Sequence, residues 1–393
     1  MKITVIGGCG HVGLPLGIAL ADQGPCVVAY DISDTAVSRV NSAVMPFRED
    51  GAQEVLERVL SAGQFQASTD PSSVAAADIV IVVIGTPVDE HLNPDPTAIR
   101  VALEECLDYF RSGQLVVLRS TIYPGVTRMV NAMFTDRRLH IDVAFCPERI
   151  AEGFAMSELR TLPQIVAGVT PEASDRAADL FSMLSPEIVR MEPEEAEMAK
   201  LFTNAWRYIK FATANQFFMM ANERGLDFER IRQGLAHNYP RAADLPRAGF
   251  AAGPCLFKDT MQLAAFSDNT FGLGHAAMLV NEGLPLYVIS RMDQLFDLSS
   301  STVGIMGMAF KGESDDTRSS LSYKLKRLLR FRAKNVLCTD PFVTDDPNLD
   351  PLEAVIDQSD VLIVGAPHEE YRYLDTSKPI IDIWNVRRMG VKV

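Results

Sequence analysis

Features of secreted, membrane-inserted and metal-binding proteins are scarce in this chain of 393 residues. Its six cysteines are scattered and form no C-x-x-C pair, which suits reduced cytoplasmic thiols and argues against a disulfide framework or a zinc site. No uncharged apolar stretch approaches the length of a membrane span. The chain opens on a strand-like run followed by glycines, so we also expect no signal peptide. The sequence therefore predicts a cytoplasmic protein with no metal site and no membrane partner.

Positive charge is also in short supply. The chain has 37 Lys and Arg residues against 51 Asp and Glu residues, which gives a net charge of −14. This balance argues against nucleic acid or an anionic membrane surface as a partner, because both repel an acidic protein. A small anionic ligand is still compatible with it, since a local site can be basic inside an acidic protein. The length suits two or three domains, each with its own core.

Apolar runs of strand length alternate with helical patterns at both ends of the chain. In the first half we expect buried parallel strands at residues 3–6, 26–30, 79–84, 115–118 and 141–145. In the last hundred residues we expect strands at residues 302–306, 335–338, 361–364 and 380–383. Strands separated by helices in this way are typical of doubly wound sheets.

A long helical segment separates these two regions. It begins at Pro193 and contains no further Gly or Pro until Gly225, a plausible C-cap, and its first turn carries three acidic residues that suit the helix dipole, Glu194, Glu195 and Glu197. At 1.5 Å per residue the helix would be roughly 48 Å long, too long for the inside of a compact domain. Such a helix usually bridges two domains or forms a subunit interface.

These patterns predict an α/β protein with two Rossmann-like doubly wound domains, residues 1–193 and 298–393, joined by an all-helical domain of residues 194–297. A faint internal repeat supports the pairing of the outer domains. The run from Asp78 to Pro87 resembles the run from Asp360 to Pro367, because each is a strand that ends in a Gly-x-Pro turn. Short strands of α/β proteins also look alike by chance.

A nucleotide-binding motif follows the first strand: Gly8-Cys9-Gly10-His11-Val12-Gly13. This is G-x-G-x-x-G between a strand and a helix, the context that the motif requires. Gly8 permits the tight turn, Gly10 lets the backbone approach a pyrophosphate at the helix start, and Gly13 lets helix and strand pack closely. The alternatives are a glycine-rich turn without a ligand, or a site for a flavin or another nucleotide.

The expected second strand ends at Asp31, at the distance from the motif where a carboxylate binds ribose hydroxyls. A carboxylate there would repel a 2′-phosphate. We therefore predict NAD, and not NADP, as the cofactor.

Two further segments carry candidate catalytic groups. Lys200 and Asn204 stand four residues apart on one face of the long helix, a pair that β-hydroxyacid dehydrogenases use to exchange the alcohol proton, although most such residues lie on solvated surfaces. Cys255 stands at the expected start of a helix in the run from Gly249 to Asp259, and Lys258 follows three residues later. The helix dipole and the ammonium both favour a thiolate, so Cys255 is a candidate nucleophile. The lone cysteines elsewhere are better interpreted as buried small hydrophobes, namely Cys106, Cys146 and Cys338.

With these motifs in order, the chain resembles the nucleotide-sugar 6-dehydrogenases, which include UDP-glucose, GDP-mannose and UDP-N-acetylhexosamine dehydrogenases. The resemblance runs nearly end to end and rests on residues 8–13, 85–87, 120–125, 147–153, 200–204, 253–259, 307–311 and 315–320. It implies an NAD-binding domain, a central helical domain that forms a homodimer and contributes to catalysis, and a C-terminal domain that binds the UDP-sugar.

The resemblance implies oxidation of the C6 primary alcohol of a nucleotide sugar to the uronate, with two NAD reduced. An aldehyde carbon cannot easily donate a second hydride, but the thiohemiacetal formed with Cys255 can, and the resulting thioester is then hydrolysed. Lys200, Asn204 and Asp259 would handle the alcohol proton and stabilise oxyanions. Glu148 resembles the base that orients the hydrolytic water, and Thr121 would support that water.

The remaining carry-overs concern binding. Thr86, Thr121, Glu152 and Arg318 resemble cofactor contacts, beside those expected from the glycine motif with Val12 and from Asp31. Contacts to the nucleotide sugar are implied for Glu148, Arg149, Lys200, Asn204, Phe250, Gly253, Lys258, Phe310 and Lys311, with the lysines suited to its pyrophosphate. Arg241 is implied to reach the substrate of a neighbouring subunit.

Two positions bear on the sugar. The chain has Arg149-Ile150 where UDP-glucose enzymes typically have Phe-Leu, and an Arg there resembles the enzymes that act on N-acetylated hexosamines. Asp382-Ile383-Trp384 departs from the Asp-Gly-Arg common in glucose enzymes and removes a cation expected near the substrate. We expect UDP-N-acetylmannosamine or UDP-N-acetylglucosamine, with UDP-glucose as the alternative.

Two other function classes compete with this reading. A two-electron β-hydroxyacid dehydrogenase would use Lys200 without covalent catalysis, and would produce one NADH per substrate and tolerate Cys255→Ala. A non-catalytic nucleotide or redox sensor would bind NAD and turn over no UDP-sugar, but it would have no need of a nucleophile.

Overall fold

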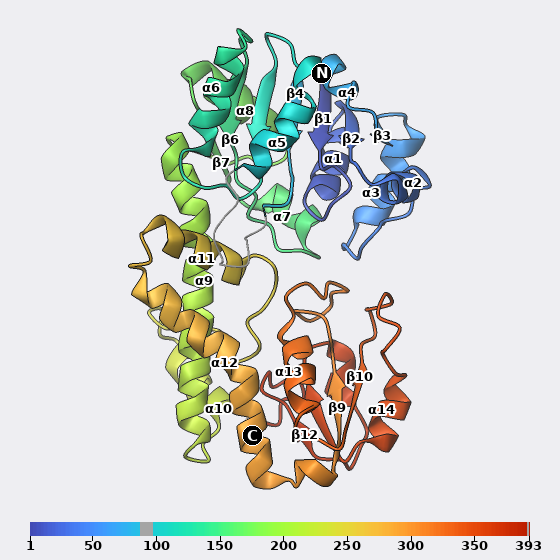
Figure 1. Cartoon of the computed structure of the whole chain (residues 1–393), viewed down its shortest axis with the longest axis vertical. Helices are drawn as coiled ribbons and strands as arrows, with labels where there is room; N and C mark the ends of the chain where they lie inside the picture. The colour runs from blue at the N-terminus through green and yellow to red at the C-terminus, as the bar shows by residue number, and fades with distance from the viewer. Residues whose placement is uncertain (87–96, 391–392) are drawn as a thin grey trace. The chain divides into compact units, whose positions relative to one another are not determined.

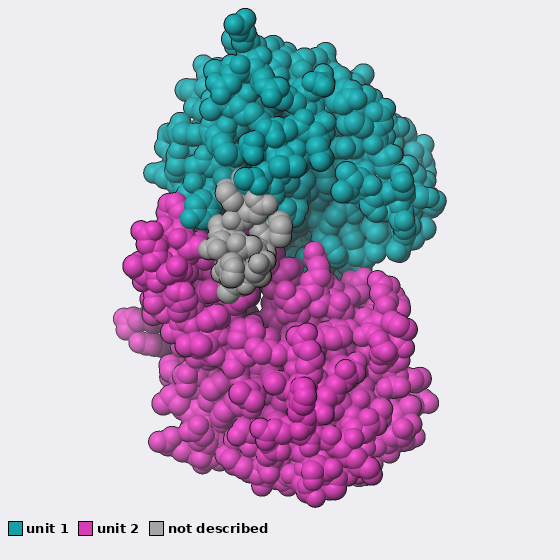
Figure 2. All heavy atoms as spheres, viewed as in Figure 1, with its two compact units in different colours: residues 1–203 teal, residues 204–393 magenta. Residues whose placement is uncertain are grey.

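Two sheets, both largely parallel, organise the residues that the computed structural model describes, which are 1–86, 97–390 and 393 (Figure 1). The chain divides into two units, residues 1–203 and 204–393, which Figure 2 shows in different colours. The division falls within one long helix, α9 (Pro193–Asn222). The domain limits at residues 193 and 297 stay predictions.

The N-terminal unit has an eight-stranded sheet with the order β3-β2-β1-β4-β5-β6-β7-β8. The first six strands in this order run parallel, which is the arrangement of a dinucleotide-binding sheet and confirms the doubly wound prediction. The seventh strand is antiparallel to its neighbour, which the sequence patterns did not indicate. The strands are β1 (Lys2–Ile6), β2 (Cys26–Tyr30), β3 (Phe65–Ser68), β4 (Ile79–Val82), β5 (Leu115–Leu118), β6 (Asp142–Phe145), β7 (Gln164–Gly168) and β8 (Ile188–Arg190).

Helices cover both faces of this sheet because successive strand residues point to opposite sides. Ile79 and Ile81 of β4 join the core with helices α1 (Gly13–Ala21), α3 (Ala52–Ser61), α7 (Ala155–Thr161) and α8 (Pro171–Ser182). Val80 and Val82 join the core on the other face, with α4 (Ser73–Ala76), α5 (Ala98–Glu105), η1 (Leu107–Tyr109) and α6 (Val126–Asp136). The short helix α2 (Asp34–Asn41) follows β2. Both faces of β4 are therefore buried, which explains its uninterrupted apolar run.

The long central helix is present as expected. α9 has 30 residues, about 45 Å at 1.5 Å per residue. Its end is a Schellman motif: the N–H of Leu226 donates to the carbonyl of Ala221 at 3.0 Å, and that of Gly225 to the carbonyl of Asn222 at 2.9 Å. Gly225 has φ +67°, a left-handed conformation that favours glycine and confirms it as the residue that ends the helix.

The rest of the middle region is also helical. After α9 come α10 (Phe228–Ala236), α11 (Leu256–Phe266), α12 (Gly272–Leu295) and η2 (Leu298–Ser300), and no strand occurs in residues 194–297, all of which the structure describes. Among the described residues, no helix combines the length and the apolar character needed to span a bilayer.

The second unit ends in a four-stranded parallel sheet with the order β10-β9-β11-β12. Its strands are β9 (Thr302–Met306), β10 (Asn335–Thr339), β11 (Val361–Val364) and β12 (Ile380–Ile381). One face packs against α13 (Leu321–Leu329) and α12, and the other against α14 (Leu352–Gln358) and η3 (Glu369–Tyr373). This arrangement confirms a second Rossmann-like sheet.

The faint repeat in the sequence corresponds to equivalent strands. β4 lies beside β1, the first strand of its sheet along the chain, and β11 lies beside β9, the first strand of the other sheet along the chain. The carboxylate of Asp78 accepts a hydrogen bond from the N–H of Lys2 at 2.8 Å, and that of Asp360 accepts one from the N–H of Thr302 at the same distance. The same anchor therefore joins the starts of the two central strands in each sheet.

Two strands are shorter than expected because their ends bond elsewhere. The run 79–84 leaves the sheet after Val82, where the N–H of Ile84 donates to Oγ of Ser120. The run 380–383 has only two strand residues, because the carboxylate of Asp382 accepts the N–H groups of Trp384 and Arg387 and turns the chain.

The end of α9 generates a stability prediction. Gly225→Ala should lower the free energy of unfolding by about 1 kcal/mol, since a Cβ is unfavourable in the left-handed region. Gly234→Ala is the matched control: Gly234 lies inside α10, where a Cβ would meet nothing within 4 Å, so this variant should gain roughly 0.5–1 kcal/mol. Chemical denaturation of both variants measures the difference, and equal effects of the two substitutions would contradict the prediction.

Candidate active site

The glycine-rich turn after β1 contains two positions, Gly8 and Gly13, where other backbone atoms approach closely. A Cβ on Gly8 would lie 2.6 Å from Cα of Ala29, and one on Gly13 would lie 2.3 Å from the carbonyl oxygen of Gly7. Both positions must therefore be glycine for α1 to pack on β1 and β2. A Cβ on Gly10 would meet nothing closer than 3.7 Å. The fold itself does not require glycine there, which fits a position kept open for a ligand.

The start of α1 suits an anion. Val12, the residue before the helix, provides no side-chain cap, and the first turn holds no acidic residue. At the end of β2, Asp31 accepts the N–H of Cys9 at 3.1 Å and that of Ser33 at 3.1 Å. A helix start for a pyrophosphate and a nearby carboxylate for a ribose are the two groups that NAD requires, so the residues present fit this cofactor.

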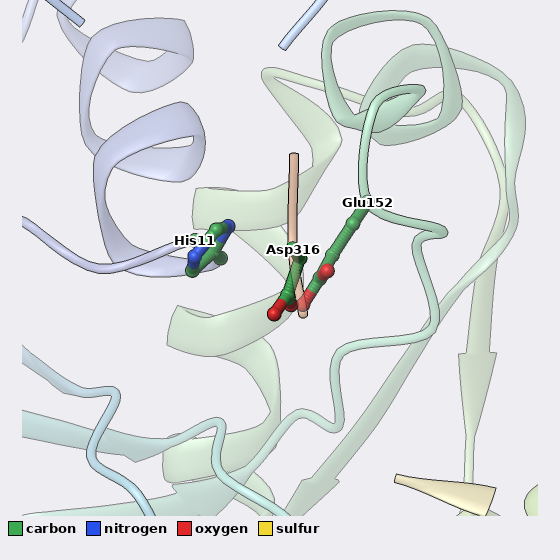
Figure 3. A group of neighbouring side chains, drawn as sticks. All are labelled: His11, Glu152 and Asp316. Carbon is green, nitrogen blue, oxygen red and sulfur yellow. The ribbon is translucent and has the colours of Figure 1, made fainter. Parts of the chain in front are cut away.

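His11 lies in the glycine-rich turn just before α1, and Glu152 lies on the segment that follows β6 (Figure 3). The ring of His11 stacks on Phe47, with centroids 4.1 Å apart. The segment that carries Glu152 is tied by Glu49, whose carboxylate accepts the N–H groups of Gly153 and Ala155 at 2.8 and 2.7 Å.

Thr86 follows β4 and is half-buried. Pro87, the last residue of the expected Gly-Thr-Pro motif, lies outside the described residues.

Glu148 is buried, with 7% of its surface exposed. Its Oε2 accepts from Nε and Nη2 of Arg119 at 2.9 and 2.5 Å, and its Oε1 accepts from the N–H groups of Arg149 and Ile150 at 2.7 and 3.0 Å. A carboxylate has about four lone-pair sites, so all are occupied. In this conformation Glu148 takes up a proton or binds a water only after one donor moves away.

Sequence reasoning missed Arg119, the partner of Glu148. It stands directly after β5, is 1% exposed, and donates further hydrogen bonds to the carbonyl of Cys146 and to Oε1 of Gln164, both at 3.1 Å. Its guanidinium also lies 4.6 Å from the ring centroid of Phe181. The available signal was a charged residue at the end of an apolar strand, because a buried Arg needs a carboxylate partner.

Arg149, expected to contact the sugar, is half-buried and donates from Nη2 to the carbonyl of Pro163. Burial lowers the pKa of its guanidinium, and the neighbouring Glu148 opposes that shift. Part of its hydrogen-bonding capacity is therefore used within the chain.

Thr121 and Lys200 are the other predicted catalytic residues of this unit. Thr121 is half-buried in the segment between β5 and α6, directly after Ser120. Lys200 is 9% exposed on α9. A buried lysine amine is suited to proton exchange or to stabilising an oxyanion.

In the second unit, the start of α11 brings together four predicted site residues. Cys255 is the exposed residue immediately before the helix. Asp259, one turn later, is completely buried, and its Oδ2 accepts from Nδ2 of Asn204 at 2.5 Å. Nζ of Lys258 lies 3.2 Å from Oδ1 of the same carboxylate, as an ion pair without the alignment of a hydrogen bond. Cys255 thus stands within one or two helical turns of the Lys258–Asp259 ion pair and of the hydrogen bond from Asn204 to Asp259.

The segment before Cys255 is fixed by buried amides that the sequence did not indicate. The side chain of Asn215 on α9 bonds both sides of Gly249, accepting its N–H at 2.9 Å and donating to its carbonyl at 3.0 Å. Asn281 on α12 accepts from Asn215 at 2.9 Å. A Cβ on Gly249 would lie 2.2 Å from the ring of Trp384.

The remaining expected ligand contacts of this unit are in several places. Phe250 is buried, with its ring edge-on to Trp384, and a Cβ on Gly253 would lie 2.7 Å from the ring of Phe310. Nζ of Lys311 lies 5.8 Å from the Phe310 ring centroid.

Two arginines of this unit are more exposed. Arg318 pairs with Asp316 at 2.6 Å, and Arg241 donates to the hydroxyl of Tyr239 at 3.2 Å. Their expected roles toward cofactor and substrate stay predictions.

The lone cysteines elsewhere behave as expected. Cys106, Cys146 and Cys338 are buried. Burial raises the pKa of Cys146 to about 12 and that of Cys338 to about 11, so both stay protonated at neutral pH. The predicted nucleophile differs from them because it is exposed.

A dinucleotide-type turn in one unit and an exposed helix-start cysteine in the other are features compatible with an NAD-dependent dehydrogenase. Family models match in the same order: the NAD binding domain of the UDP-glucose/GDP-mannose dehydrogenase family over residues 1–185, its central domain over 194–282 and its UDP binding domain over 304–388. The chain belongs to the UDP-glucose/GDP-mannose dehydrogenase family and is an NAD-dependent dehydrogenase.

Curated relatives and solved structures agree with this assignment. UDP-N-acetyl-D-mannosamine dehydrogenase of Pyrococcus horikoshii is 30% identical over 95% of this chain and 90% of its own, and that of Yersinia pestis is 29% identical over 99% and 98%. The solved Pyrococcus horikoshii enzyme superposes with a TM-score of 0.91 at 28% identity, covering 98% of this chain and 96% of its own. A UDP-glucose dehydrogenase from Pyrobaculum islandicum has the same TM-score at 26% identity, covering 100% and 96%.

Gly249 is held by two hydrogen bonds to Asn215 and packs against Trp384, and this arrangement generates a prediction for the segment that leads to Cys255. Gly249→Ala places a Cβ inside the ring of Trp384, and should lower kcat roughly 100-fold because small displacements near reacting groups have effects of this size. Gly283→Ala on α12, where a Cβ meets nothing within 4 Å, should keep the kcat of the unsubstituted protein. Steady-state kinetics at a temperature where both variants are folded measures the difference. A fully active Gly249→Ala enzyme would show that the close packing of Gly249 is not needed to position this segment.

Proposed function

We propose that the chain oxidises the C6 primary alcohol of a UDP-N-acetylhexosamine, UDP-N-acetylmannosamine or UDP-N-acetylglucosamine, to the uronate in a four-electron reaction. The observation that carries the proposal is the start of α11, where an exposed thiol is flanked by Lys258 and by the buried pair of Asp259 and Asn204. The names of the relatives in Pyrococcus horikoshii and Yersinia pestis support this sugar class.

The first half-reaction needs a base for the alcohol proton. We assign this proton exchange to Lys200, with Asn204 and Asp259 stabilising charge on the oxygen. The hydrogen bond from Asn204 leaves Oδ1 of Asp259 for interaction with a cation. NAD, held at the glycine-rich turn and by Asp31, would supply the hydride acceptor for both oxidation steps.

The second half-reaction needs a carbon that can lose another hydride. The sulfur of Cys255 adds to the aldehyde carbon and a proton goes to the oxygen, which forms a thiohemiacetal. Loss of that proton and a hydride gives a thioester. The position of Cys255 at a helix start, three residues before Lys258, favours the thiolate that must attack the aldehyde.

Hydrolysis completes the reaction: water adds to the thioester carbon, the C–S bond breaks, and the carboxylate and the Cys255 thiol are released. We assign orientation of this water to Glu148 and Thr121. Because Arg119 and two backbone N–H groups occupy Glu148, one of these donors must exchange for the water during turnover.

UDP-glucose is the alternative substrate, favoured by the close structural similarity to the UDP-glucose dehydrogenase of Pyrobaculum islandicum. Against it stands Trp384, an uncharged ring packed on Gly249 and Phe250 where glucose enzymes commonly have an arginine. A ring at this place supplies an apolar surface, which suits an acetamido methyl group better than a hydroxyl.

The decisive experiment is to count NADH per sugar in a panel of UDP- and GDP-sugars. We expect two NADH per UDP-N-acetylhexosamine oxidised, because the thiohemiacetal delivers the second hydride. Cys255→Ala should lose at least 1000-fold in kcat, roughly the effect of removing a covalent nucleophile. Cys26→Ala, which removes the other exposed thiol, should keep full activity.

One NADH per substrate together with an active Cys255→Ala enzyme would instead identify a two-electron β-hydroxyacid-type dehydrogenase. NAD binding without turnover of any sugar would identify a nucleotide sensor.

We also propose that the chain forms a homodimer through its central helices. Large apolar side chains are exposed at helical spacing on α9, at Trp206, Phe217 and Met220, and on α12, at Leu279 and Leu286. Each of them is at least 43% exposed. Monomeric proteins rarely expose contiguous apolar faces of this kind, and a second copy of the same face would cover it. The cytoplasmic location expected from the sequence stays a prediction.

Leu279→Glu tests the dimer. A charge in the apolar face should raise the dissociation constant by at least 100-fold, since it is buried without a partner in the assembly. Phe331→Glu is the control, because Phe331 is 86% exposed and lies outside α9 and α12, shortly after α13. Light scattering gives the mass of each variant, and an unsubstituted protein with the mass of one chain would contradict the proposal.

A further inference from the structure

A buried carboxylate on α9 holds the start of another helix. Glu197 has no exposed surface. Its Oε2 accepts the N–H of Gly125 at 2.7 Å, and its Oε1 accepts the N–H and the hydroxyl of Thr127 at 2.9 and 2.5 Å. The carboxylate therefore ties α9 to the first turn of α6 over a separation of 70 residues along the chain.

The need for this tether follows from the way α6 begins. Its N-cap is Gly125, at φ +98°, which has no side chain to accept the N–H groups of the first turn. Glu197 supplies the missing acceptor and places a negative charge at the positive end of the α6 dipole. Burial raises the pKa of the Glu197 carboxyl, and its hydrogen bonds to Thr127 and Gly125 oppose that shift. Acidic residues near a helix start are ordinarily explained by their own helix dipole, but Glu197 caps α6 instead.

Two of the three predicted catalytic residues of the N-terminal unit are on α9 and on the segment that leads into α6. Lys200 lies one turn after Glu197 on α9. Thr121 lies four residues before Gly125. The residue directly before it is Ser120, whose Oγ accepts the N–H of Ile84 at 2.8 Å. The short segment with Thr121 is therefore fixed at both ends, and one of these fixed points is the turn of α9 next to Lys200.

We propose that Glu197 is a positioning residue that sets Thr121 relative to Lys200. The inference rests on the proposed function, because it assumes that these two residues serve the alcohol oxidation and the thioester hydrolysis. Glu197 itself touches neither substrate nor cofactor in this proposal. Its contribution is to hold two reacting groups from different elements in one geometry, which effective catalysis requires.

An exposed ion pair joins the same two helices and provides the matched control. Glu194 on α9 pairs with the guanidinium of Arg128 on α6, and their side chains are 42% and 49% exposed. Solvent screens this pair, so its loss should alter the geometry little. Glu194→Gln and Glu197→Gln thus remove the same charge from the same helix, one at the surface and one inside.

The test is the rate of each half-reaction in Glu197→Gln. The amide that replaces one oxygen is a donor and faces backbone N–H groups, so the first turn of α6 should shift. We expect kcat to fall at least tenfold, with both alcohol oxidation and thioester hydrolysis slowed in single-turnover experiments, and the KM for NAD to change less than twofold. Glu194→Gln should stay within twofold of the unsubstituted protein in all three quantities.

Thr127 gives a second, milder readout. Thr127→Val removes one of the three hydrogen bonds to Glu197 and should reduce kcat by a smaller factor, and Thr127→Ser, which keeps the hydroxyl, should restore it. A purely structural loss would instead track the fraction of unfolded protein and disappear well below the melting temperature.

The outcomes separate the two proposals. If the unsubstituted protein oxidises a nucleotide sugar and Glu197→Gln has the same kcat, the positioning role is wrong and the proposed function stands. An effect that vanishes in the cold also overturns it. If the unsubstituted protein produces no NADH with any nucleotide sugar, the proposed function fails and the inference fails with it.

Discussion

Segments that leave the carboxyl ends of parallel strands carry backbone N–H groups that no neighbouring strand can accept, and in this chain carboxylates accept several of them. Asp31 takes two such groups from the segments after β1 and β2, and Glu148 takes two from the segment after β6. Asp340, after β10, accepts four. An unpaired buried N–H costs about 1–3 kcal/mol, so these acids make it feasible for irregular segments to be buried and ordered.

Order without regular secondary structure is what the reaction demands of these segments. Several predicted ligands and reacting groups, such as Asp31, Thr121 and Glu148, are in the stretches between elements, where no ladder of hydrogen bonds fixes the backbone. Arg119 extends the same principle, since its guanidinium connects the ends of three strands through Glu148, the carbonyl of Cys146 and Gln164. In the second unit, the neutral side-chain amide of Asn215 accepts the N–H of Gly249 and donates to its carbonyl, and so fixes that segment in a similar way. Each acceptor also restricts which substitutions its segment tolerates.

Local patterns in the sequence were sufficient for most elements, although β3, β7 and β8 were not predicted, and they were insufficient for these contacts. Strands buried on both faces appear as apolar runs, and the long helix was recognisable from Pro193 to the glycine that ends it. The limits of strands were less accurate, because they depend on hydrogen bonds such as that from Ile84 to Ser120. The cysteine at the start of α11 was found because helix, glycines and lysine are local. The roles of Glu197 and Arg119 were not found, since their partners are distant in the chain and leave no periodic signal.

The contrast between exposed and buried thiols has a consequence for handling the protein. Cys26 and Cys255 are the two exposed cysteines, whereas the other four are buried and Cys9, Cys146 and Cys338 have raised pKa values. Oxidation to sulfenic and sulfinic acids follows exposure and thiolate character. Peroxide damage should therefore concentrate at these two thiols, one of which is the sulfur on which turnover is proposed to depend. A preparation stored without reductant would lose active sites while its fold, and the spectra that report it, stay intact.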